Sequence, residues 1–215
     1  MNVRILYEDA DILVCVKPAG TASQTKRIGE QDMVSLLKNY RMKKGEEPYL
    51  GLVHRLDQPV EGIMVFGKNP QSTAGLNEQM KDGDFGKIYL AAVQGFLPDK
   101  EGRLENYLKK DGRKNVSIVV PKGEPGAKRA VLEYQVLQRE EHRPISLVRI
   151  RLRTVRHHQI RVQMAHLGVP IVGDGRYGKE KEKGQALKLC ACELNFRHPK
   201  THEELRFQIE PSWRE

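Results

Sequence analysis

The segment Ser146–Arg153 carries an aliphatic side chain at every second position from Val148 onward, with an arginine after each one. This period of two is typical of a β-strand with one buried and one exposed face. Other apolar runs are equally short. Asp11–Val16, for example, is followed at once by the turn residues Lys17-Pro18-Ala19-Gly20. The sequence therefore favours a fold that is rich in short strands.

Helices are expected over Gln31–Lys44, from Pro70 to a stop at Gly83 with Asn69 as N-cap, and over His158–Leu167. In the last of these, Ile160, Met164 and Leu167 are expected on the inner face. Strict strand–helix alternation is rare, which favours an α+β fold with a mainly antiparallel, bent sheet flanked by helices over a doubly wound parallel sheet. Further strands are expected at 52–55, 62–67, 87–93, 116–120, 130–137, 187–196 and 205–209.

The 215 residues are 39% hydrophobic, which suits one globular core. No apolar run approaches the roughly 20 residues that cross a bilayer. The first ten residues lack the layout of a secretion signal. Three cysteines imply no disulfide framework and fit a reducing compartment. We therefore expect a soluble, cytoplasmic protein of one domain, without repeats or an interdomain linker.

The chain is basic: Lys and Arg total 37 and Asp and Glu total 28, which gives a net charge of +9. Such a surface attracts polyanions, and nucleic acid is the first candidate. Seven arginines but two glutamates lie between Arg139 and Arg161. A stripe of arginines on a strand can follow a phosphate backbone. It can equally be a solvated outer face of a sheet, and the two interpretations stay open.

Three polar clusters can carry chemistry: Gly51–Asp57, Gly86–Leu90 and Arg156–Arg161. A zinc site is the alternative for the histidines and cysteines. However, the histidine spacing lacks the one-turn pair of common zinc helices. Cys190 and Cys192 have one residue between them, where zinc pairs use two to four. They are better explained as buried thiols on one face of a strand, even though His198 and His202 follow. We therefore expect no metal.

As a whole, the sequence resembles the RluA-type pseudouridine synthase family, whose members isomerise uridine in RNA. The resemblance runs from Ile5 to about Trp213, and its blocks occur in the family's order. They are Asp11–Gly20, His54–Asp57 with the sequence His-Arg-Leu-Asp, Lys87–Gly95, His158–Arg161, Ala165–Tyr177 and Leu189–Pro199.

The resemblance implies that Asp57 is the catalytic aspartate and that Arg161 is the arginine paired with it. It implies that Tyr89 lies against the target base and that Arg55 helps to displace the target nucleotide. Together with the arginine stripe, these blocks give the residues expected to contact RNA, which are His54, Arg55, Arg149, Arg151, Arg153, Arg156, His158 and Gln159.

The chemistry suits these residue types. Pseudouridine forms when the bond between ribose C1′ and uracil N1 breaks and the base rejoins through C5. A carboxylate that acts at the ribose must be ionised, and a guanidinium partner favours that charged form. The base must leave its stack, at a cost of roughly a few kcal/mol, and a tyrosine ring gives it a stacking surface. No redox step is needed, so no cofactor is expected.

The sequence departs from the family's usual pattern in two places. After the catalytic aspartate, the usual Thr-Ser-Gly reads Val60-Glu61-Gly62, so that a negative charge is added near Asp57. In the later motif, Val155 replaces a glycine and His157 a threonine. These changes leave the residues assigned to chemistry in place, but they put the loop shape and the choice of RNA in doubt.

We expect one pseudouridine synthase catalytic domain over residues 1–215, without the small N-terminal RNA-binding domain of some family members. Its partner is expected to be ribosomal or transfer RNA, and the protein is expected to act as a monomer without a membrane. Two rivals remain open. One is a catalytically weakened RNA-binding protein that keeps the fold. The other is a metal-dependent phosphodiesterase that uses His54, Asp57, His158 and Asp174.

Overall fold

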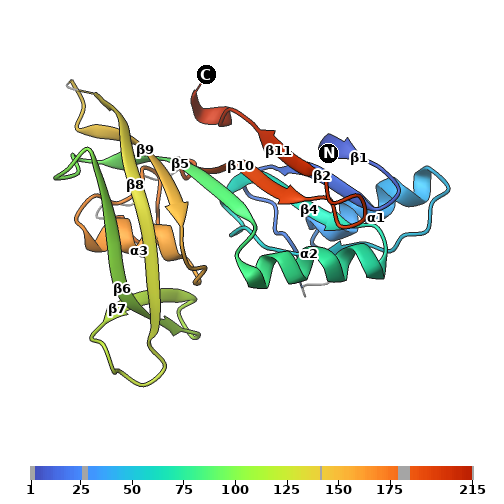
Figure 1. Ribbon diagram of the computed structural model, residues 1–215. Coiled ribbons are helices and arrows are strands. Elements are labelled where there is room, and N and C mark those ends of the chain that lie inside the picture. Colours follow the sequence, from blue (N-terminus) through green and yellow to red (C-terminus); the bar gives the residue numbers. More distant parts are fainter. Residues whose placement is uncertain (1–2, 26–28, 141, 179–184, 215) are drawn as a thin grey trace. The chain divides into compact units, whose positions relative to one another are not determined.

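The computed structural model describes residues 3–25, 29–140, 142–178 and 185–214. The chain divides into two compact units, which are residues 1–87 with 191–215, and residues 88–190. Both contain strands and helix (Figure 1). Every strand pairing whose register is described is antiparallel. This confirms the expected α+β class with a mainly antiparallel sheet.

The first unit is built on strands that pair in the order β1-β2-β4-β10, with β3 beside β4 and β11 beside β10. Its elements are β1 (Arg4–Glu8), β2 (Ile12–Lys17), α1 (Met33–Lys43), β3 (Gly51–Leu52), β4 (Glu61–Gly67), α2 (Pro70–Asp82), β10 (Leu189–Arg197), β11 (Glu204–Gln208) and the short 3-10 helix η1 (Ser212–Arg214). The strand β4 is buried along its whole length, which makes it the centre of this unit.

Local sequence sets the ends of the two helices in this unit. The side chain of Asp32 accepts a hydrogen bond from the backbone N–H of Ser35 and caps α1. Asn69 caps α2 in the same way, and Gly83 ends it with a φ of 85°. The expected caps of α2 are therefore confirmed. Its residue Leu76 is fully buried, as is Leu37 of α1.

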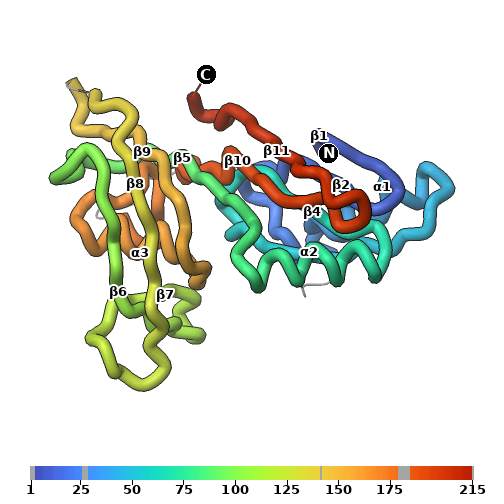
Figure 2. The backbone as a smooth tube through the Cα atoms, viewed as in Figure 1, coloured from blue at the N-terminus to red at the C-terminus, as the bar shows by residue number. Residues whose placement is uncertain are grey.

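The second unit pairs its strands in the order β5-β9-β8-β6-β7. Figure 2 shows β6, β8 and β9 running side by side. The elements are β5 (Gly86–Gln94), β6 (Glu101–Asp111), β7 (Val116–Val120), β8 (Lys128–Glu140), β9 (Ile145–Leu152) and α3 (Gln159–His166). Val162 of α3 packs with Leu108 and Ala130 in the core, and so fixes α3 on one face of these strands.

The sequence did not indicate β1 or β6. In β6, charged side chains at Glu101, Arg103 and Glu105 are exposed, and the residues between them are only half-buried. The strand therefore lacks the apolar alternation that predicts a strand. In α3, Ile160 and Met164 are buried as expected, whereas Leu167 lies just beyond the helix and is half-buried.

Within the part of the chain that the structure describes, no helix is long and apolar enough to span a bilayer.

Candidate active site

Asp57 lies half-buried in the loop between β3 and β4, and the backbone on both sides of it is fixed. Before it, the Ser23 hydroxyl donates to the carbonyl of Leu56 (2.9 Å) and accepts from the Leu56 N–H (3.0 Å). After it, the Gln58 carbonyl accepts from the N–H of Gly20 (2.9 Å). Asp57 is therefore held on a loop whose path leaves little freedom.

Lys17 also holds the loop of Asp57. Its side chain is fully buried, and Nζ donates to the carbonyls of Pro18 (3.1 Å), Thr21 (2.7 Å) and Gln58 (3.0 Å). Three acceptors match the three N–H groups of a charged ammonium. Burial lowers the pKa of Lys17 to about 8, and the negative charges of Asp57 and Glu61 oppose that shift. A buried cation therefore sits beside the carboxylate predicted to be catalytic.

His54 points into the core instead of toward solvent and is 6% exposed. Its Nε2 accepts from the backbone N–H of Val65 in β4 (3.2 Å). Burial, and second the charge of Lys87, hold the pKa of His54 well below its usual range. The ring is therefore neutral and fastens the loop of Asp57 to β4. This placement supports a positioning role for His54 over a direct contact with RNA.

Arg55 is exposed, in contrast to the residues on either side of it. Its Nη2 donates to the side-chain oxygen of Gln24 (3.0 Å). A long, exposed cation two residues before Asp57 is free of the core and suited to contact a nucleotide or a phosphate.

In the second unit, Arg161 of α3 forms a buried, two-pronged ion pair with Asp174. Nε donates to Oδ2 and Nη2 to Oδ1, both at 2.8 Å, and the side chains are 4% and 0% exposed. Burial alone would raise the pKa of Asp174. The hydrogen bonds and charge of Arg161, with backbone N–H groups of Arg176 and Tyr177, lower it below its ordinary value. The pair therefore ties α3 to the turn that follows it.

Tyr177 connects this pair to the start of α3 and to β7. Its ring lies 5.2 Å from the Arg161 guanidinium, and its hydroxyl is 2.8 Å from His158 Nδ1. The same hydroxyl accepts from the backbone N–H of Ser117 (2.7 Å). His158 has a φ of 53°, an uncommon value for a residue with a side chain. His158 and Arg161 are thus placed together by buried contacts.

Gln159 is also buried, at 3% exposed. Its side-chain N–H donates to the carbonyl of Val131 (3.0 Å), and its oxygen accepts from the Thr154 hydroxyl (3.0 Å). These contacts fasten α3 to β8 and indicate a structural role for Gln159.

Tyr89 lies in β5 and is 8% exposed. In the antiparallel register it is opposite Ile150 of β9, whereas Arg149 is opposite Leu90 and Arg151 is opposite Ile88. Directly opposed residues share a face of the sheet, and successive residues alternate. Arg149 and Arg151 therefore project from the face opposite to that of Tyr89.

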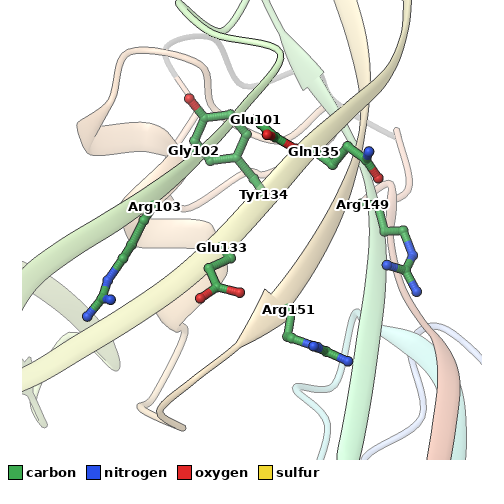
Figure 3. A pocket seen from close by; sticks show the side chains of 8 residues that line it. All are labelled: Glu101, Gly102, Arg103, Glu133, Tyr134, Gln135, Arg149 and Arg151. Atoms are coloured by element: carbon green, nitrogen blue, oxygen red, sulfur yellow. The ribbon is translucent and has the colours of Figure 1, made fainter.

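On that opposite face, β6, β8 and β9 line a pocket of about 590 Å³ (Figure 3). Its charges are mixed, so that it is not a uniformly basic groove. The lining residues are Glu101, Gly102, Arg103, Glu133, Tyr134, Gln135, Arg149 and Arg151.

The remaining arginines of the stripe have partners on the protein surface. Arg153 holds Glu133 through two hydrogen bonds of 2.9 Å. Arg156 Nε donates to the carbonyl of Arg129 (2.9 Å). The alternation predicted from the sequence is confirmed, but the stripe and Tyr89 do not share a face.

Among the described residues, the group of potential metal ligands that gathers is Asp9, Asp11 and His198. Nδ1 of His198 accepts from the backbone N–H groups of Lys200 (3.2 Å) and Thr201 (3.0 Å). Nε2 therefore carries the proton and donates to Asp9 Oδ2 (2.9 Å). A ring with both nitrogens engaged in this way has no lone pair for a cation.

Two of the residues that a metal-dependent phosphodiesterase would use are also bonded to other groups of the protein. Asp174 is held by Arg161, and the Nε2 lone pair of His54 is taken by Val65. Cys190 and Cys192 are buried, as expected, and are not in a disulfide, and His198 is bonded to Asp9.

Asp57, His54 and Arg55 belong to the first unit, and Tyr89, His158 and Arg161 to the second. Sequence reasoning missed Lys17 and Ser23, which fix the loop of Asp57. Lys17 stood within a block that carries the resemblance, and a lysine at the end of a buried strand was the available signal. Ser23 gave no signal, since its partner Leu56 is 33 residues away.

Replacing Ser23 by Ala is expected to lower the free energy of unfolding by about 1–3 kcal/mol, because the buried N–H and carbonyl of Leu56 both lose their partner. Urea denaturation measures this change. Wild-type stability in Ser23→Ala would show that the two bonds do not hold the loop.

Replacing Asp174 by Asn is expected to lower the free energy of unfolding at pH 7 by about 3–5 kcal/mol, because it leaves a buried guanidinium without its counter-charge. The folded pKa of Asp174 lies below the unfolded value of about 3.9. The ionised carboxylate therefore stabilises the fold above about pH 4, and this contribution is lost as the pH falls. Denaturation curves of wild type and Asp174→Asn are expected to converge in acid.

Glu133→Gln is the matched control, since its ion pair with Arg153 is exposed and contributes less than about 1 kcal/mol. An equal loss in both variants would contradict the distinction between the buried and the exposed pair.

Residues 11–166 match the model of the family described as RNA pseudouridylate synthase. The chain is 36% identical to the dual-specificity RNA pseudouridine synthase RluA of Vibrio parahaemolyticus, over 92% of this chain and 79% of that one. It is 33% identical to the ribosomal large subunit pseudouridine synthase C of Buchnera aphidicola subsp. Baizongia pistaciae, over 95% of this chain. It spans 65% of the length of that relative.

Solved structures agree on the fold. Human RNA pseudouridylate synthase domain containing 4 superposes with a TM-score of 0.81 at 23% identity, over 98% of this chain and 89% of that one. The match of the family model and the identity to the Vibrio protein lead to one conclusion. The chain belongs to the RNA pseudouridylate synthase family.

Proposed function

We propose that this protein is an RNA pseudouridine synthase that converts uridine to pseudouridine in structured ribosomal or transfer RNA, with Asp57 as its catalytic carboxylate. The observation that carries the proposal is the loop of Asp57. In a chain of this family, the aspartate of the His-Arg-Leu-Asp motif is half-buried, and Ser23, Gly20 and Lys17 hold the backbone of the residues on either side of it, Leu56 and Gln58. Such fixation is what a group that must meet a reacting atom requires.

The reaction balances without a co-reactant. The bond between ribose C1′ and uracil N1 breaks, the base turns, and C5 bonds to C1′. The proton on C5 leaves to solvent, and N1 gains one. The carboxylate of Asp57 acts at the ribose and returns unchanged, so neither a metal nor a cofactor enters the scheme.

Arg161 is proposed to stabilise the ionised form of Asp57. A guanidinium has five N–H donors in a planar fork. Holding Asp174 through Nε and Nη2 fixes the plane of this fork. In this scheme Asp174 orients the guanidinium of Arg161. Tyr89 is proposed to stack on the extruded uracil, which every base allows through its π-face.

RNA contacts are proposed to divide between two sides. Arg55 takes the space vacated by the displaced nucleotide, and Arg156 contacts phosphate near the start of α3. Arg149, Arg151 and Arg153 lie on the face opposite to Tyr89, so they bind a part of the RNA away from the target base. His158, Gln159 and His54 support the site through their buried contacts.

The proposals on oligomeric state, domain extent and location rest on the sequence analysis. The protein is proposed to act as a monomer, as one catalytic domain over residues 1–215, and in the cytoplasm.

Asp57→Asn is expected to abolish the reaction, because the amide cannot carry the negative charge. RNA labelled with tritium at uracil C5 releases the label to water when pseudouridine forms, and this release measures the reaction. The variant is expected to fold and to bind RNA as wild type does. Asp82→Asn, at an exposed acid that ends α2, is the matched control and keeps full release.

Release by Asp57→Asn at the wild-type rate would refute the assignment. Binding of RNA without any release by the wild-type protein would favour the rival, a non-catalytic RNA-binding protein.

Treatment with a chelator such as EDTA is expected to leave tritium release unchanged, because both the Asp174 carboxylate and the Nε2 of His54 are engaged within the protein. Loss of release that added divalent metal restores would contradict the metal-free scheme. Cleavage of the RNA chain that EDTA stops and added divalent metal restores would instead support the phosphodiesterase.

A further inference from the structure

Glu61 is the first residue of β4. In the sequence pattern of the family described above, this position is usually serine. Its side chain does not face solvent, and the residue is 7% exposed. Oε1 accepts from the backbone N–H of Ser212 (3.0 Å), and Oε2 accepts from the Ser212 hydroxyl (2.7 Å). Both oxygens of a buried carboxylate are therefore bound by a single residue 151 positions later in the chain.

Ser212 begins the short helix η1, which is attached to the sheet just before it. Ile209 is buried, and its N–H donates to the carbonyl of Cys192 in β10 (2.9 Å). Pro211 is buried as well. The segment 209–214 is thus bonded to β10 through Ile209 and to the start of β4 through Glu61.

The backbone at Glu61 is also fixed. The next residue, Gly62, has a φ of 145°, and a Cβ built there would lie 2.5 Å from the Cβ of Ala191 in β10. Only glycine fits at this position. Gly62 pairs with Lys17 across β2 and β4. Glu61 is therefore the neighbour, on a tightly packed strand, of the residue that pairs with Lys17.

Lys17 links this region to the catalytic loop. The negative charges of Glu61 and Asp57 both favour its ammonium form. That ammonium holds the carbonyl of Gln58, the residue directly after Asp57. Ser212 is thus hydrogen-bonded to Glu61, the adjacent Gly62 pairs with Lys17 in the sheet, and Lys17 holds the backbone beside Asp57.

We propose that Glu61 and Ser212 form a positioning pair for the catalytic carboxylate, in which Ser212 holds Glu61 and Glu61 supports the Lys17 ammonium under the loop of Asp57. The pair is distinct from the residues proposed to contact RNA. The inference rests on the proposed function for its kinetic consequence, but not for its structural one.

The kinetic test compares Glu61→Gln, Ser212→Ala and the double variant with wild type in the tritium-release assay. Each single variant is expected to lower kcat about 10-fold, because small displacements of a reacting group are costly. KM for RNA is expected to stay unchanged. The double variant is expected to lose no more than either single variant, since both remove the same pair. Glu210→Gln is the matched control, because Glu210 is exposed and pairs with Arg214.

The structural test needs no activity. Amide hydrogen exchange at Gly20, which donates to Gln58, and at Val60, which donates to Asp57, is expected to quicken in Glu61→Gln and Ser212→Ala but not in Glu210→Gln. If Glu61→Gln does not fold, Ser212→Ala decides, since it removes one hydroxyl from an exposed residue.

Unchanged exchange at both amides in Ser212→Ala would overturn the proposal, and so would unchanged kcat in an active enzyme. A raised KM at constant kcat would also overturn it, because that result indicates a role in binding RNA. An inactive wild-type protein in which exchange quickens as expected would refute the proposed function and leave the structural pair intact.

Discussion

A buried ammonium underlies the first unit of this protein. Lys17 has no contact with solvent, and its charge is stabilised by three carbonyl dipoles and by nearby carboxylates. An ion taken out of water is stable only when such partners surround it. The carbonyls come from the turn after β2 and from the loop before β4, so the ion requires those two segments to stay together. The position of Asp57 is a consequence of that requirement.

The second unit solves a similar problem with a different cation. Arg161 is planar and is held at two points by Asp174, and its orientation is therefore fixed as well as its charge. Tyr177 then connects the pair to His158 and to Ser117. Each unit thus places a buried cation next to the residues expected to do chemistry. One cation positions a backbone loop, and the other presents donors.

Features that depend on neighbouring residues could be predicted from the sequence. The cap at Asn69, the stop at Gly83 and the alternation after Val148 are local, and the structure confirms them. Whether Tyr89 lies on the same face of the sheet as the arginines of β9 could not be predicted. A shift of one residue in the register between β5 and β9 would exchange the two faces. The partner of Glu61 could not be predicted either, since it comes from the far end of the chain. The strand β6 was missed because the residues between its exposed charges are only half-buried and do not form a regular apolar alternation.

The order of the units along the chain has a consequence for biosynthesis. Residues 88–190 are continuous, whereas the other unit combines the beginning of the chain with residues 191–215. During translation, the continuous unit emerges complete before β11 exists. The strand β4 cannot pair with β10 until β10 has been synthesised. Their pairing closes a loop that contains all residues between the two strands. The entropic cost of such a closure grows only with the logarithm of the loop length, and it falls when the loop is already compact. The segment 88–190 can therefore assemble first, whereas the other unit is completed only after β10 and β11 have been synthesised.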